Sequence, residues 1–218
     1  MHFLLFDDPK LAILYFVVLI LSLSVHEFAH AWSAWKLGDD TAARMGRMTL
    51  NPVPHIDVFG TILLPLFNAP IGWAKPVPVN PARFRRGISM STGDIIVSAA
   101  GPVSNLLFGL ISAVILGLLL RFAPGTVDDG SPAFVFLNRM MLVNAGLAIF
   151  NILPVPPLDG SHVAANLMPY RYRGAWDQFA RMAPFLLVTL VLFGGAVIRP
   201  PLRLVFGLLW RVTAGIAV

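Results

Sequence analysis

The sequence contains no cysteine and little charge. Of its 218 residues, 12% are Asp, Glu, Lys or Arg, whereas 57% are apolar. Without thiols the chain can form no disulfide, iron–sulfur site or zinc–thiolate site, so any metal ligands must be His, Asp or Glu. Globular proteins carry roughly 25% charged residues. The composition therefore disfavours a soluble enzyme and excludes a disordered chain, which would be poor in apolar residues.

The net charge is +5, but the positive residues are scattered along the chain. No basic stripe with interleaved aromatic residues is present, so nucleic acid is not a predicted partner. Positive charges that flank apolar segments are instead typical of membrane proteins. The lipid bilayer is therefore the predicted environment.

Five hydrophobic segments are candidates for crossing a bilayer, which takes about 20 mostly apolar residues. The clearest is Ile95 to Leu120, which carries no charge. We expect another to begin before Arg139, and arginines in the last could keep it in the interface. We therefore predict an all-α polytopic membrane bundle of four to five transmembrane helices. The other four segments are 11–35, 140–155, 182–198 and 202–218.

The stretch 38–93 is rich in proline and glycine and too irregular for a spanning helix. Two pieces, 46–50 and 72–79, favour extended structure, and the prolines of the second suit an edge strand. We predict a small membrane-embedded β element here, between the first two helices. The chain 1–218 is predicted to be a single membrane-embedded domain, with a core at about 11–165 and C-terminal hydrophobic helices at about 176–218.

Lysine and arginine predict the orientation of the helices, because they gather in cytoplasmic loops. If the first four segments cross in alternation, the loops 34–94 and 156–181 lie on one side and carry ten Lys or Arg residues. The other side carries five. We therefore predict a multi-pass protein of the cell membrane whose two large loops are cytoplasmic.

Glu27 is the only glutamate in the chain and lies in the first hydrophobic segment, within the sequence H-E-F-A-H. An ionisable residue at such depth is costly and is a functional candidate by default. Residues i and i+4 share one helix face, so His26 and His30 can bind the same metal ion, with Glu27 placed to take a proton from water. The alternative interpretation is a polar cluster that only holds helices together.

A catalytic zinc site needs a third protein ligand. Asp159 is the candidate, and it follows a proline-rich run that must end a helix. At about 1.5 Å per residue, His26 lies roughly 22 Å along the first helix, in the cytoplasmic part of a hydrocarbon core about 30 Å thick. The segment 140–155 runs inward and ends near Pro154, so Asp159 lies at the same side. Taken alone, Asp159 could also belong to an ordinary turn.

Together these motifs resemble the site-2 protease family of intramembrane zinc metalloproteases, in its short bacterial and archaeal branch without a PDZ domain. The resemblance covers residues from about 20 to 165. The motifs that carry it are His26-Glu27-x-x-His30, Gly46–Pro52, Gly72–Pro81, Gly101-Pro102-x-x-Asn105, and Asn151-x-x-Pro154 leading to Leu158-Asp159-Gly160.

The resemblance implies that His26, His30 and Asp159 bind one zinc ion per chain and that Glu27 is the general base. It implies that Asn151 contacts the substrate or the oxyanion, and that the loop between the first two helices pairs with an unwound substrate. The implied function is an intramembrane zinc endopeptidase that cuts single-span membrane proteins near their cytoplasmic end, with its active site toward the cytoplasm.

Two other functions stay open from the sequence alone. A metal-ion transporter could line an ion path with the same side chains, although transporters usually show inverted repeats and none is visible here. A relative that binds membrane helices without cutting them is the third interpretation, although every element needed for catalysis is present. The substitution Glu27→Gln separates the three functions. It should abolish cleavage by a protease while zinc stays bound. It should disturb a transporter only if Glu27 carries the ion, and it should not affect a relative that only binds helices.

A few other polar residues have weaker functional interpretations. His55 and Asp57 could form a second metal pair, but loop hydrogen bonds are the simpler interpretation. His162, three residues after Asp159, could lie near the zinc, but we expect it to be structural or to support the zinc ligands. Asn144 is expected to hold helices together by hydrogen bonds, and Asn105 could lie near the site.

Overall fold

The computed structural model describes residues 9–63, 73–125, 127–128 and 130–218. Short 3₁₀ turns lie at Val53–His55, Pro81–Arg83 and Tyr170–Tyr172, and a π-helical turn lies at Val58–Leu63. The described residues contain no strand, so the all-α class is confirmed. The α-helices are α2 (Pro9–Leu37), α3 (Thr41–Arg44), α5 (Met90–Phe122), α6 (Pro132–Ile152), α7 (Asp159–Leu167), α8 (Arg173–Arg181), α9 (Ala183–Phe193) and α10 (Gly195–Ala217).

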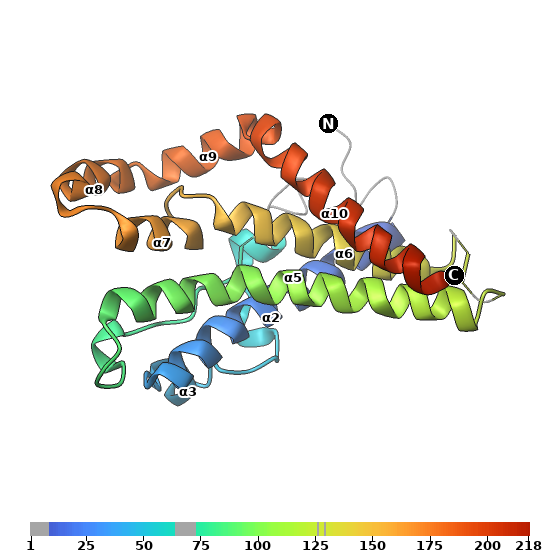
Figure 1. The fold of residues 1–218 in the computed structure, drawn as a ribbon, viewed down its shortest axis with the longest axis horizontal. Helices are drawn as coiled ribbons and strands as arrows, with labels where there is room; N and C mark the ends of the chain where they lie inside the picture. The colour runs from blue at the N-terminus through green and yellow to red at the C-terminus, as the bar shows by residue number, and fades with distance from the viewer. Residues whose placement is uncertain (1–8, 64–72, 126, 129) are drawn as a thin grey trace.

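Helices α2, α5 and α6 form the centre of the bundle, and α5 packs against both of the others as well as α7 and α10 (Figure 1). The ends of these helices are set by local sequence. Ser89 accepts a hydrogen bond from the backbone N–H of Thr92 at the start of α5, and Ser131 caps α6 ahead of Pro132. All three helices are long and apolar enough to cross a membrane.

The main core lies where α5, α6 and α10 meet. Ala113, Met141 and Leu209 are buried there, one from each helix. Gly117 lets α10 approach α5 closely, because an added Cβ would lie 2.8 Å from the Thr213 carbonyl oxygen. Small residues at helix contacts allow such close packing, which matters in a bilayer because lipid supplies no hydrophobic drive between helices. Figure 1 shows α10 running along the bundle toward the end of α5.

Among the residues that the structure describes, three single helices are long and apolar enough to be spans. A fourth arises only if residues 170–181 and 183–193, which meet at a bend of 71°, are counted as one. The third span begins at Pro132, ahead of Arg139, as predicted. The predicted fourth helix, 182–198, is instead broken at Gly194, and its last residues belong to α10. The predicted four to five spans are therefore not confirmed.

The predicted β element is also not confirmed. Residues 46–50 form turns and bends, and residues 73–80 have no regular secondary structure. Pro76 and Pro78 lack the N–H groups that a strand ladder needs. The remainder of the predicted element, residues 64–72, lies outside the described residues. Individual hydrogen bonds to other segments of the chain, rather than a strand ladder, hold the described part of this loop.

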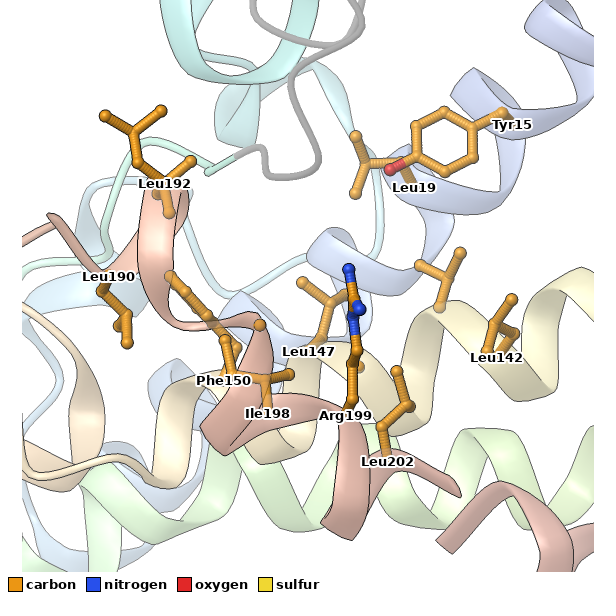
Figure 2. A pocket seen from close by; sticks show the side chains of 14 residues that line it. Tyr15, Leu19, Leu142, Leu147, Phe150, Leu190, Leu192, Ile198, Arg199 and Leu202 are labelled. Atoms are coloured by element: carbon orange, nitrogen blue, oxygen red, sulfur yellow. The ribbon is translucent and has the colours of Figure 1, made fainter. Parts of the chain in front are cut away.

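A cavity of about 420 Å³ lies between α2, α6, α9 and α10 (Figure 2). Its walls are mostly apolar and include Leu19 from α2 and Leu147 from α6, and the side chain of Arg199 extends into it from α10. None of the five predicted site residues lines this cavity. It is therefore separate from the cluster of His and Asp side chains described next.

Candidate metal centre

His26, His30 and Asp159 come together, as the sequence predicts. The two histidines lie one turn apart on α2, and Asp159 is the first residue of α7. Their Nε2 atoms are 3.0 Å apart, and Asp159 Oδ2 lies 3.2 Å from Nε2 of His26 and 3.4 Å from Nε2 of His30. One ligand atom from each of the three residues thus points at a common place.

These three side chains fit a zinc ion. Their ligand atoms all lie within 4.8 Å of one another. Asp159 Oδ2 is buried and has no hydrogen-bond partner. Burying a carboxylate oxygen in this way is costly unless a bound cation balances its charge. Two imidazoles and one carboxylate are a common ligand set for catalytic zinc.

The rings of both histidines are oriented by hydrogen bonds at Nδ1. His26 Nδ1 lies 2.6 Å from Asn105 Oδ1, and His30 Nδ1 lies 2.7 Å from the backbone carbonyl of Val97. Both partners belong to α5 and present oxygen. Each Nδ1 therefore carries the hydrogen, which leaves Nε2 of each ring as the metal-binding atom.

Two glycines allow the helices to meet at this point. A Cβ on Gly101 of α5 would overlap the imidazoles of His26 and His30. A Cβ on Gly160 would overlap the backbone of Ile152, where α6 ends. Glycine after Asp159 thus lets α7 start against the end of α6, which brings the carboxylate to the histidines.

Glu27 is buried beside this cluster and is held by the loop. Its Oε2 accepts a hydrogen bond of 2.9 Å from the backbone N–H of Val77. The loop is fixed in turn by the Arg47 guanidinium, which donates to the Lys75 carbonyl at 2.6 Å, and by the Asn80 N–H, which donates to Asp39 at 2.6 Å. A carboxylate with one oxygen held in this way can accept a proton on the other.

Asn151 is not brought into contact with the three metal-ligand candidates among the described interactions. Its side-chain NH₂ donates to the carbonyl of Leu147, one turn back in α6, at 3.1 Å. The structure therefore adds no contact in favour of the oxyanion role, which stays a prediction.

The weaker candidates lie outside the cluster. His55 Nε2 pairs with the Thr49 carbonyl at 2.9 Å, and Asp57 accepts from the Gly60 N–H at 2.7 Å, in line with loop hydrogen bonds. His162 Nδ1 lies 3.7 Å from Asp94 Oδ2, and this carboxylate raises the pKa of His162.

Two groups at the site were missed by reasoning from the sequence. They are the Val77 N–H on Glu27 and the Val97 carbonyl on His30. Both are backbone groups, which every residue carries, so no sequence signal could have found them.

The family model and the relatives that match this chain point to the same protein family. The model of peptidase family M50 matches residues 125–194. The chain is 40% identical over 192 residues to "Putative zinc metalloprotease YwhC" of Bacillus subtilis, which covers 86% of this chain and 84% of the relative. It is 30% identical over 191 residues to "Putative zinc metalloprotease Rip2" of Mycolicibacterium smegmatis, covering 86% of this chain and 69% of the relative. No solved structure matches the chain.

The family model covers only part of the chain, whereas the relatives cover most of it. The alignment to the Bacillus subtilis relative is long on both sides and well above 30% identity. The chain therefore belongs to peptidase family M50, the site-2 protease family, and is a zinc metalloprotease.

Proposed function

We propose that this protein cuts peptide bonds within or near the transmembrane segment of single-span membrane proteins, with His26, His30 and Asp159 as the ligands of one zinc ion. The observation that carries the proposal is the convergence of two Nε2 atoms and one carboxylate oxygen at a buried point on a membrane helix. The same helix supplies Glu27 next to the first ligand.

The chain's own groups supply the remaining chemistry. A zinc ion held by the three ligands supplies Lewis-acid chemistry and activates water for attack. Glu27 accepts the proton of the attacking water and passes it to the leaving amine. The Val77 N–H keeps one carboxylate oxygen of Glu27 in place. Asn151 is proposed to donate to the negative charge that develops on the scissile carbonyl oxygen.

The proposed site lies toward the cytoplasmic ends of the helices. The charge bias of the loops supports this orientation. His26 and His30 lie in the second half of α2. Asp159 lies seven residues after Ile152, where α6 ends. Water then has a short path to the site. The packing of α10 against α5 and α6 supports a single domain that includes the C-terminal helices.

The proposal is tested by reconstituting the full chain in vesicles with single-span substrates and removing the metal. A zinc chelator is expected to abolish cleavage, and added zinc is expected to restore it, because all three proposed ligands hold the same ion. Fragment termini identified by mass spectrometry should fall within or near the span. If no fragment forms while zinc crosses the vesicle membrane, a transporter replaces the protease.

Replacing Gly101 by alanine tests the position of the histidines. A Cβ at this position overlaps both imidazoles, so Gly101→Ala is expected to weaken zinc binding by about 10- to 100-fold, as loss of a ligand's support does. Gly109→Ala on the same helix is the matched control, because its Cβ would lie 3.4 Å from its nearest neighbour, Leu209. Competition with a chromophoric chelator measures both. Equal zinc affinity in the two variants would contradict the proposed ligand positions.

A further inference from the structure

A chain of buried hydrogen bonds leads from His26 across two helices to the backbone of α6. His26 Nδ1 lies 2.6 Å from Asn105 Oδ1, and the Asn105 NH₂ donates to Asn144 Oδ1 at 2.9 Å. Both asparagines have no exposed surface. The chain joins α2, α5 and α6 through two asparagine side chains that have no contact with solvent.

Backbone carbonyls fix the direction of every bond in this chain. The Asn144 NH₂ donates to the Met140 carbonyl and to Ser22 Oγ, both at 2.9 Å. A carbonyl can only accept, so the nitrogen of Asn144 must face Met140 and its oxygen must face Asn105. The Asn105 NH₂ is then taken by Asn144 and by the Ser22 carbonyl at 3.2 Å.

This direction decides the state of His26. With its nitrogen committed, Asn105 can present only oxygen to His26, and an oxygen requires the hydrogen on Nδ1. The neutral ring then has its lone pair on Nε2, the atom that faces Asp159. His30 obtains the same state directly from the Val97 carbonyl, whereas His26 obtains it from the Asn105 side chain, which Asn144 and the Ser22 carbonyl hold in place.

We infer that Asn144 is a positioning residue which, together with the Ser22 carbonyl, holds Asn105 so that it orients His26 and favours the zinc-binding tautomer, and so raises the affinity for zinc. The inference rests on the proposed function, in which His26 is a zinc ligand. It differs from the simpler role of Asn144 as a hydrogen bond between helices, because that role would affect stability and leave zinc affinity unchanged.

The test is a double-mutant cycle on the full chain in detergent, with zinc affinity measured by competition with a chromophoric chelator. Asn144→Leu and Asn105→Leu are each expected to weaken zinc binding by about 10- to 100-fold. The double variant should lose no more than Asn105→Leu alone, because Asn144 acts only through Asn105. Thermal unfolding of the zinc-free proteins reports the structural contribution separately.

Thr213→Val is the matched control. Thr213 is also fully buried and donates an interhelical hydrogen bond, to the Ala113 carbonyl of α5 at 3.1 Å, but it has no link to the histidines. This variant should lower the unfolding temperature and leave zinc affinity unchanged. If Asn144→Leu does not fold, Asn144→Ala takes its place in the cycle.

Two results would overturn the inference. One is a zinc affinity of the Asn144 variant within twofold of the wild type, and the other is a double variant whose loss is the product of the two single losses. His26→Ala separates this failure from that of the proposed function. Unchanged zinc affinity in His26→Ala overturns both, whereas weakened binding in His26→Ala with normal binding in the Asn144 variant overturns the inference alone.

Discussion

Glu27→Gln is expected to reduce the turnover number for peptide cleavage by about 1,000-fold, within the range of general acid–base catalysis. Glutamine has the same shape as glutamate but cannot accept the proton of the attacking water. Its carbonyl oxygen can still accept the hydrogen bond that Val77 donates to Glu27, so the loop should stay in place. Zinc content is expected to be unchanged, because Glu27 is not one of the three proposed ligands.

The measurement is cleavage in vesicles together with zinc content by metal analysis. Asp40→Asn is the control for loss of a carboxylate. Asp40 is paired with Arg44 at 2.6 Å and with Arg83 at 3.3 Å, on an exposed part of the protein away from the histidines. This control should cleave at the wild-type rate. Turnover of Glu27→Gln within tenfold of the wild type would exclude Glu27 as the general base.

Asp159→Ala is expected to remove zinc from the protein. The three candidate ligand atoms form one group, and the variant leaves only the two histidines to hold the ion. Loss of a group that merely supports a ligand costs about 10- to 100-fold in affinity, so loss of the ligand itself should cost more than 100-fold. Cleavage should fall to background at low zinc concentration and recover in part when zinc is in excess.

Asp94→Asn is the matched control for this variant. Asp94 is also a half-buried carboxylate near α7, where it accepts from Asn166 at 2.5 Å and faces His162. Its replacement should leave zinc affinity unchanged, because it lies outside the ligand group. Chelator competition on both variants gives the comparison. Zinc binding that survives in Asp159→Ala and is lost in Asp94→Asn would move the metal site to the other carboxylate.

Local sequence patterns were sufficient to predict helices α2, α5 and α6 and to name the residues of the candidate site. Long uncharged runs and helical spacing are local properties, so hydropathy predicts α2, α5 and α6, and the i, i+4 spacing predicts that His26 and His30 face one point. The rarity of acidic residues in hydrophobic segments singled out Glu27. Asp159 was predicted from its place after a helix that was expected to end on the same side of the membrane as the histidines.

The C-terminal helices show where hydropathy fails. The apolar segment 182–198 predicts one span, but the chain breaks at Gly194 between α9 and α10. Hydropathy averages over such a break, since glycine is compatible with an apolar segment. The loop shows a similar limit, because extended segments form a strand only if a partner with free N–H and carbonyl groups lies alongside.

The groups that surround the site could be found only from the three-dimensional packing of the helices. The Asn105 side chain and the Val97 carbonyl reach the histidines because α5 crosses α2 at Gly101, and the Val77 N–H reaches Glu27 because the loop folds back onto α2. These partners are far apart in sequence, and two of them are backbone groups that carry no sequence signal. Which helix faces meet depends on how all helices pack together, so these contacts could not be predicted from local pattern.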